Sequence, residues 1–153
     1  MKIKRSIPKG LRAASAKALS QGTTAGYSGT PLPKKLGLRD HSTLILSNPP
    51  EAFERKLAPM PAGAEILEDA HRANVAVLFV RSQVELARGF RPLAKALPQR
   101  VAMWIAWPKK ASGIPTDVTE NVVRAFGLGA GWVDYKVCAI DETWSGLCFA
   151  RKQ

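Results

Sequence analysis

Two stretches of the chain are apolar at almost every position, and they predict the centre of the fold. Residues 75–80 (V-A-V-L-F-V) and 101–107 (V-A-M-W-I-A-W) lack the polar alternation of a half-exposed strand. Short continuous apolar runs that are rich in β-branched residues are typical of strands covered on both faces, as in a parallel sheet. Shorter runs at 42–47 and 64–67 predict two further strands, with a short helix between them at 51–57.

Helical spacing of apolar residues begins shortly after the first of the two long apolar runs. Ser82 and Glu85 have the spacing of a capping box, which predicts a helix start at Ser82. Apolar side chains then recur at helical intervals up to about Leu97. Pro92 lies inside this segment, and the helix can be split there because proline lacks a backbone N–H group.

A second capping box predicts another helix. Asp117 and Glu120 have the same spacing, Pro115 stands just before them, and apolar residues follow at helical intervals up to Phe126. The segment 127–131 (G-L-G-A-G) is expected to break the chain, because glycine is a poor helix former.

The C-terminal part of the chain predicts a β-hairpin. Residues 132–140 and 146–150 have strand-like patterns on either side of a five-residue loop, 141–145. If that loop is symmetric, Cys138 lies opposite Cys148 across the hairpin. The whole pattern predicts an α/β fold of three layers, with a mostly parallel, Rossmann-like sheet closed by a C-terminal antiparallel hairpin.

The net charge of +11 is concentrated near the N-terminus. Residues 1–39 contain nine Lys or Arg and no acid, whereas the rest of the chain has 14 basic and 12 acidic residues. We therefore expect residues 1–26 to be a flexible basic segment, followed by a single α/β domain at 27–153. The basic residues within 1–39 favour either an arm that binds nucleic acid or a solvated tail, and their composition also overlaps with that of organellar transit peptides.

Several classes of chemistry find no support in the sequence. Cys138 and Cys148 do not have zinc-ligand spacing, and His41 and His71 lie far from them, so no metal site is predicted. No Ser-His-Asp arrangement or carboxylate pair is evident, which makes an enzyme the less favoured interpretation. No apolar run approaches the roughly 20 residues that span a membrane. Two reduced thiols and no membrane span indicate a cytoplasmic protein.

The loop that follows the 101–107 strand is the best candidate site. It reads W-P-K-K-A-S-G-I-P-T-D, and it combines two lysines with a Ser-Gly turn ahead of a helix start, which are the ingredients of an anion pocket. A rigid structural connection is the alternative. The loops at 27–35 and 141–146, which concentrate Lys, Ser, Gly and Trp, complete the candidate site with residues at the carboxyl ends of two strands, where open α/β sheets bind ligands. The predicted ligand-binding residues are Thr30, Lys34, Lys35, Asn48, Glu68, Trp107, Lys109, Lys110, Ser112, Gly113, Asp141, Trp144 and Ser145.

Two of these residues have a specific alternative. Glu68 follows the 64–67 strand, where nucleotide-binding sheets place an acid against ribose hydroxyls, but a surface acid is commonly just solvated. Trp144, in the predicted hairpin loop, is either a binding contact or a lid that packs on the domain.

Three motifs of the chain resemble an uncharacterised bacterial family, a domain of unknown function. They are Y-S-G-T-P-L-P-K-K-L-G-L at 27–38, W-P-K-K-A-S-G-I-P-T-D at 107–117 and K-V-C-A-I-D-E-T-W-S-G-L at 136–147. The resemblance covers about residues 27–151 and leaves out the basic segment. It implies no established activity.

More distantly, the order of elements is similar to the class I S-adenosylmethionine-dependent methyltransferase fold, of which a closing antiparallel hairpin is the hallmark. By this resemblance, 42–47 is the first strand and Glu68 or Asp69 is the ribose-binding acid. The segment 47–50 (S-N-P-P) stands where that fold has a glycine-rich cofactor loop.

Three functional hypotheses follow from these observations. The leading one is a non-catalytic or degenerate methyltransferase-like module that binds an anionic ligand or a protein partner. The second is an active methyltransferase that uses S-adenosylmethionine through an atypical cofactor loop. The third is a nucleic-acid binder that uses the basic arm.

Overall fold

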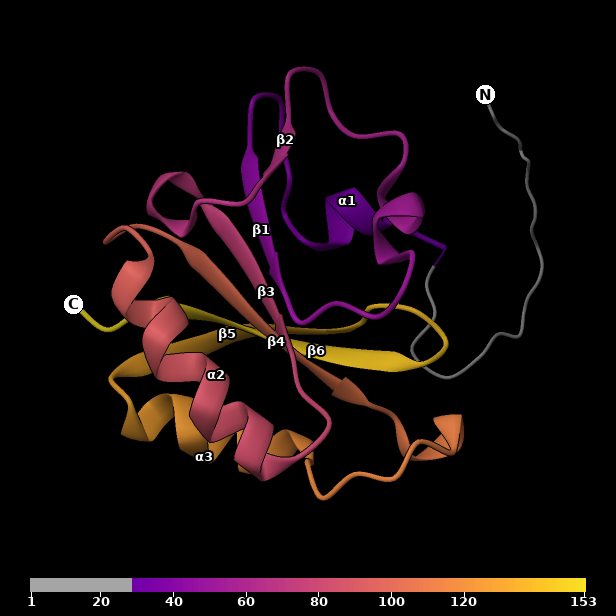
Figure 1. Ribbon diagram of the computed structural model, residues 1–153, viewed down its shortest axis with the longest axis vertical. Helices are drawn as coiled ribbons and strands as arrows, with labels where there is room; N and C mark the ends of the chain where they lie inside the picture. The colour runs from indigo at the N-terminus through magenta and orange to yellow at the C-terminus, as the bar shows by residue number, and fades with distance from the viewer. Residues whose placement is uncertain (1–28) are drawn as a thin grey trace.

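The computed structural model describes residues 29–153, which form a six-stranded mixed sheet and few helices (Figure 1). The basic segment 1–26, and with it most of the predicted nucleic-acid arm, lies outside the described residues. The strands are β1 (Thr43–Ser47), β2 (Glu65–Leu67), β3 (Val75–Phe79), β4 (Ala102–Pro108), β5 (Trp132–Ala139) and β6 (Trp144–Arg151). In the described part of the chain, no helix is long and apolar enough to cross a membrane.

The sheet is parallel in its centre and antiparallel at one edge. Its strand order is β2-β1-β3-β4-β6-β5. The first four strands run parallel, and β6 runs antiparallel between β4 and β5. The expected α/β class, with a mostly parallel sheet and an antiparallel C-terminal hairpin, is confirmed. The chain order reverses between β1 and β3, so the topological switch point of the parallel part lies there.

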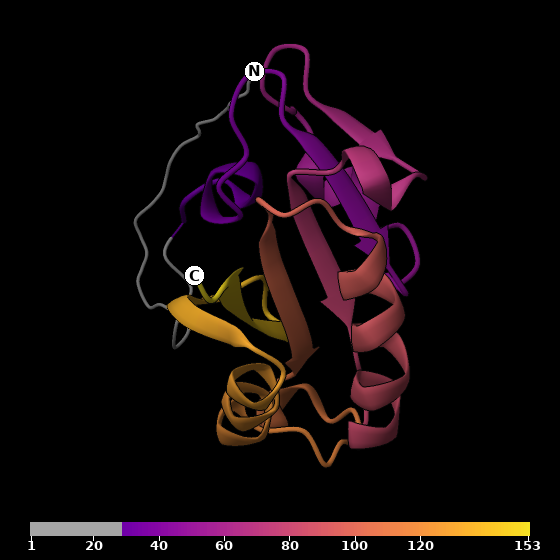
Figure 2. The same cartoon turned by 90° about the vertical axis from the view of Figure 1, so that its left-hand side faces the viewer.

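Helical segments lie on both faces of the sheet (Figure 2). The α-helices are α1 (Leu32–Lys35), α2 (Gln83–Ala96) and α3 (Glu120–Gly129). The longer helices α2 and α3 pack on one face, while α1 and a 3-10 turn at Phe53–Leu57 pack on the other. That 3-10 turn replaces the helix expected at 51–57, because Ala52 takes a left-handed conformation (φ 63°) and interrupts the helical backbone.

Burial on both faces explains the two continuous apolar runs. All five residues of β3 are buried. Leu78 belongs to the core beneath α2, together with Phe90. The neighbouring Phe79 points to the other layer, where its ring meets that of Phe53 edge-to-face at 4.8 Å. A strand in this position has no solvent face on which polar residues would be favoured.

The start of α2 follows the predicted capping box with one difference. The Ser82 hydroxyl accepts a hydrogen bond from the Glu85 N–H (3.1 Å), as expected. The Glu85 carboxylate reaches one residue further back and accepts from the Arg81 N–H (2.8 Å). Pro92 does not split the helix, which is continuous over Gln83–Ala96. Its ring is exposed, and the buried Leu86 and Phe90, which precede it in the helix, hold α2 to the sheet.

The end of α2 is held by the last residue of β6. One guanidinium nitrogen of Arg151 donates to the carbonyl oxygens of Ala94 (2.8 Å) and Leu97 (3.1 Å). The same guanidinium group lies 4.5 Å from the ring centroid of Trp132. A cation at a helix C-terminus satisfies carbonyl groups that have no partner within the helix.

Asp117 does not cap the helix that it precedes, and that prediction is wrong. The cap of α3 is Thr119, whose hydroxyl accepts from the Val122 N–H (3.2 Å). The Asp117 carboxylate instead accepts from the Gln83 N–H (2.8 Å), at the start of α2. The loop after β4 passes beside that helix start, so the acid satisfies an unpaired N–H group of α2 rather than one of its own helix.

The glycine-rich segment 127–131 does not break the chain where expected. Helix α3 continues to Gly129, and the turn comes at Gly131, whose φ is +92°. Gly127 is buried where the helix meets β6. A Cβ atom at Gly127 would lie 2.1 Å from a ring carbon of Phe149, so the absence of a side chain permits this close approach.

The register of the hairpin is shifted by two residues from the expected one. Strand β6 begins at Trp144, and Cys138 lies opposite Gly146 rather than opposite Cys148. The carboxylate of Asp141 accepts hydrogen bonds from the Thr143 and Trp144 N–H groups, both at 2.8 Å. An Asp side chain that bonds the backbone two residues ahead tightens a turn. The loop is therefore shorter than the symmetric five-residue loop that the sequence suggested.

Candidate anion-binding cleft

A cleft of about 800 Å³ opens at the carboxyl ends of β4 and β5, next to α1. It lies at the edge of the sheet where open α/β folds bind ligands. Its lining residues come from α1 and the segment just before it, the loop after β4, the start of α3 and the two strands of the hairpin. They are Thr30, Lys34, Lys35, Lys109, Glu120, Lys136, Val137, Cys138, Ala139 and Ser145.

Three segments that are far apart in the sequence meet in this cleft. They are 27–38, 107–117 and 136–147, which are the segments that carry the family resemblance. The described lining residues include four lysines and one acid, Glu120. That acid forms an ion pair with Arg124 (2.7 Å), so part of its charge is already neutralised. The cleft therefore has a net positive charge.

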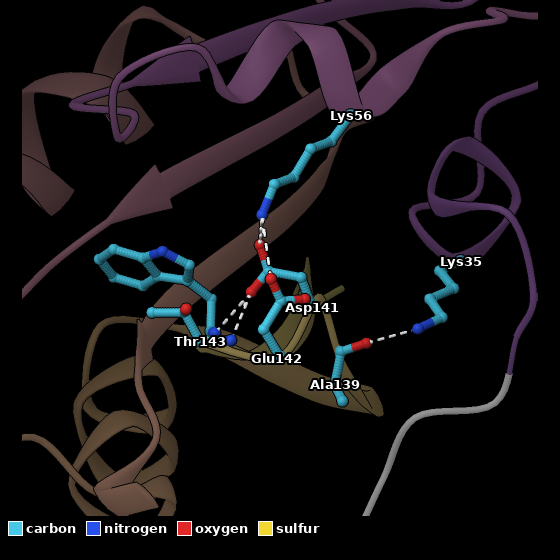
Figure 3. Close-up of polar contacts among 7 residues, drawn as sticks. Lys35, Lys56, Ala139, Asp141, Glu142 and Thr143 are labelled. Atoms are coloured by element: carbon cyan, nitrogen blue, oxygen red, sulfur yellow. Dashed lines mark hydrogen bonds and ion pairs between the residues drawn. The ribbon is translucent and has the colours of Figure 1, made fainter. Parts of the chain in front are cut away.

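Lys35 is the buried member of the four lysines. Its side chain crosses from α1 to the hairpin, where Nζ donates to the carbonyl oxygen of Ala139 (2.9 Å; Figure 3). Burial lowers the pKa of Lys35; the neighbouring Cys138 opposes this shift and Lys109 adds to it. This hydrogen bond fixes the Lys35 ammonium group against the end of β5.

Lys136 and Cys138 extend the cleft wall along β5. Lys136 Nζ donates to the backbone carbonyl of Lys35 (2.9 Å) and lies 5.9 Å from the ring centroid of Trp104. The Cys138 thiol is free. Burial raises the pKa of Cys138. The nearby charges of Lys35 and Lys136 act in the opposite direction but do not outweigh burial, so the pKa lies above its ordinary value. Cys138 is therefore a neutral thiol near pH 7, and it adds apolar surface to the cleft.

Asp141 holds the hairpin loop behind the cleft rather than lining it. Its carboxylate is buried, accepts the two backbone hydrogen bonds described above and pairs with Lys56 Nζ at 2.7 Å (Figure 3). Burial by itself raises the pKa of Asp141. The hydrogen bonds from Lys56, Trp144 and Thr143 outweigh it, so the pKa lies below its ordinary value.

The two predicted tryptophans are structural. Trp107 is buried in the core beneath α2 and α3. Trp144 is 3% exposed, meets Phe79 edge-to-face at 5.2 Å and lies under the guanidinium group of Arg81 (5.1 Å to the ring centroid). The sequence left open whether Trp144 is a binding contact or packs on the domain, and in the structure it packs on the domain.

The loop after β4 contributes Lys109 to the cleft and uses its other predicted residues for its own turn. The Ser112 hydroxyl donates to the Lys109 carbonyl (2.6 Å) and accepts from the Ile114 N–H (3.2 Å). Gly113 ends a 3-10 turn in the left-handed region (φ +80°), which favours glycine. Lys110 is exposed and does not line the cleft. The loop is thus a rigid connection that positions Lys109.

Asn48 and Glu68 lie outside the cleft, at the carboxyl ends of β1 and β2. The Asn48 amide donates across the switch point to the Phe79 carbonyl (3.1 Å). Glu68 is exposed. The resemblance to methyltransferases would place S-adenosylmethionine at this end of β1, but Pro49 and Pro50 have no N–H group, and the Asn48 amide is already engaged. The loop after β1 therefore does not fit the cofactor in the way that the resemblance implies.

On the hairpin side of the cleft, sequence reasoning predicted Ser145 of β6 but missed the residues of β5. Lys136, Cys138 and Ala139 lie within a predicted strand, whereas the predicted site residues belong to loops and strand ends. The sequence feature that could have identified Lys136 is its position near the end of an edge strand, because the carboxyl ends of strands form the ligand-binding edge of the sheet.

No protein-family model matches the chain, and no curated protein matches it either. The family resemblance and the methyltransferase resemblance therefore remain predictions. Among the side chains of residues 29–153, no group of three or more His, Cys, Asp or Glu is placed to hold a metal ion.

Proposed function

We propose that the protein is a non-catalytic, methyltransferase-like α/β module that binds an anionic ligand in the cleft between α1 and the hairpin. The observation that carries the proposal is the convergence of Lys34, Lys35, Lys109 and Lys136 on one cleft. The strand order and the antiparallel closing hairpin support the methyltransferase-like part of the proposal.

The charge and the shape of the cleft both favour an anion. Four ammonium groups that line one concave surface repel one another, and a bound anion relieves that repulsion. A cleft of about 800 Å³ has the size of a small-molecule site. Val137 and Ala139 form an apolar part of the wall, so the cleft suits an anion that is attached to a less polar group.

The residue types at the cleft favour binding over catalysis. The lining combines cations, hydroxyl groups and small apolar side chains. Cys138 is a neutral thiol, and Glu120 is paired with Arg124. This set holds an anion through charge-assisted hydrogen bonds, and it supplies neither an activated nucleophile nor a free general base.

Replacing both Lys34 and Lys109 with glutamine is expected to weaken the binding of inorganic pyrophosphate by about tenfold to 100-fold. Each substitution removes a charge-assisted contact and leaves a neutral polar side chain that is about one bond shorter. Neither residue forms a described side-chain ion pair, so the fold should be unaffected. Isothermal titration calorimetry of the full chain at fixed ionic strength measures the affinity.

A matched control removes the same charge elsewhere. Arg91 and Lys95 are exposed on α2, on the other face of the sheet, and the double substitution Arg91→Gln with Lys95→Gln should change the affinity less than threefold. Equal losses in both double variants would show that binding follows net charge and not the cleft. Undiminished binding in the Lys34/Lys109 variant would also contradict the proposal.

A further inference from the structure

A β-bulge on β5 places two consecutive side chains on the same face of the sheet. The pairing with β6 shifts between Asp134 and Lys136, which leaves Tyr135 as the extra residue. The Cys148 thiol donates a hydrogen bond to the Tyr135 hydroxyl (3.2 Å). Lys136 lies over Trp104, which belongs to the same core cluster as Cys148. In a regular strand the consecutive side chains of Tyr135 and Lys136 would point to opposite faces of the sheet. The bulge redirects one of them, so that both lie on the same face.

These two side chains line a second cleft of about 400 Å³ on the α1 side of the sheet. Arg39 and Trp104 also contribute to its wall. Lys136 lines both this cleft and the lysine cleft, so the two adjoin. The Tyr135 side chain is largely exposed, with a relative exposure of 60% for the residue, and its hydroxyl is held by Cys148. It is therefore an aromatic platform that is held in place before any ligand arrives.

We propose that the anionic ligand is a nucleotide unit whose phosphate lies among the lysines of the first cleft and whose base stacks on Tyr135 in the second. This inference rests on the proposed anion-binding function and names its ligand class. A planar base offers a π-face that stacks on an exposed aromatic ring whatever the base is. The cations Lys136 and Arg39 line the same cleft as Tyr135, as expected for a site that binds a base joined to phosphate.

The same chemistry has two sources, a free nucleotide and a nucleotide within a single strand. The charge of the chain favours the strand. Thr30 lines the lysine cleft, and the preceding residues 1–28 contain six Lys or Arg and no acid. This basic sequence is covalently joined to a cleft residue, and its charge favours a ligand with several phosphates over a free nucleotide.

The test compares three probes on the full chain at one salt concentration: inorganic pyrophosphate, ADP and a ten-nucleotide oligothymidylate. ADP is expected to bind about five- to 150-fold more tightly than pyrophosphate, which is the range that stacking of one base covers. Tyr135→Leu should remove that gain and leave pyrophosphate binding unchanged. Tyr135→Phe, which keeps the ring and loses the hydroxyl, should retain most of it. Tighter binding of the oligonucleotide than of ADP assigns the site to a strand, and equal or weaker binding assigns it to free nucleotides.

The outcomes separate this inference from the function on which it rests. If pyrophosphate binds but ADP gains nothing, or if Tyr135→Leu leaves ADP binding unchanged, the nucleotide inference is overturned and the anion site stands. If pyrophosphate does not bind at all, the proposed function fails and the inference fails with it.

Discussion

Replacing Asp141 with alanine is expected to lower the free energy of unfolding by about 3 kcal/mol, because buried hydrogen-bonding groups lose their partner. The Asp141 carboxylate accepts from the N–H groups of Thr143 and Trp144 and pairs with Lys56. The Trp144 N–H group is buried, so water does not readily replace the lost acceptor. Urea denaturation at pH 7 measures the change.

The matched variant Asp141→Asn separates the backbone contacts from the ion pair. The amide oxygen still accepts from Thr143 and Trp144, so the expected loss is about 1 kcal/mol, which reflects mainly the pair with the half-exposed Lys56. Equal losses in the alanine and asparagine variants would show that the backbone hydrogen bonds contribute nothing beyond the charge.

The stability difference between the wild type and Asp141→Asn is expected to depend on pH. The pKa of Asp141 is lower in the folded chain than its ordinary value, so the carboxylate binds a proton more readily in the unfolded chain. Its contribution to stability is therefore present above about pH 4, the ordinary Asp value, and is lost as the pH falls through the lower folded value. The stability difference between the wild type and Asp141→Asn should be constant near neutral pH and shrink below about pH 4.

Gly127→Ala is the second substitution with a large expected effect, a loss of about 2 kcal/mol in the free energy of unfolding. The added Cβ atom would lie 2.1 Å from a ring carbon of Phe149. Phe149 is fully buried, so its ring has no free space into which to move. Either the helix or the strand must shift, and the strain exceeds the gain of about 1 kcal/mol that alanine brings to a helix.

Gly129→Ala is the control, because it is the same substitution two residues later on the same helix. A Cβ atom at Gly129 meets nothing within 4 Å. The stability of this variant should stay the same or rise by up to about 1 kcal/mol. Thermal and urea denaturation of both variants test the contrast, which would be contradicted if Gly127→Ala were as stable as Gly129→Ala.

The sequence predicted the elements of the sheet well where the physics is local. The apolar runs at 75–80 and 101–107 became β3 and β4, because strands that are buried on both faces need apolar side chains at every position. The predicted cap at Ser82 is also confirmed. Its hydroxyl accepts from an N–H group three residues later, so the contact lies within one helical turn and depends on local sequence alone.

The errors arise where a tertiary contact replaced a local one. Asp117 has the local pattern of a helix cap, but it satisfies the start of a different helix, 34 residues away in the sequence. Gly127 has the composition of a chain break, but it meets the requirement of close packing against Phe149. In each case the role of the residue is determined by a contact with a segment that is distant in the sequence. A single sequence does not show such a contact.

The candidate site was predicted in part. Lys109 was predicted because a basic loop at the carboxyl end of a strand favours anions, and Lys35 because lysines are concentrated in the loop before the first strand; both line the cleft. Lys136 was missed because its place depends on the register of the hairpin. That register was set by the hydrogen bonds of the Asp141 side chain and by the bulge at Tyr135, neither of which follows from hydrophobic patterning.

Backbone NMR during a titration with inorganic pyrophosphate tests the central claim most directly. The account predicts saturable shifts of the amide signals of Lys109, Cys138 and Ser145, which come from the loop after β4 and from both strands of the hairpin. The signals of Asn48 and Arg81, at the switch point, should stay unchanged. Saturable shifts that are confined to the switch point, or no saturable shift in the cleft at millimolar pyrophosphate, would contradict the assignment of this cleft as the anion site.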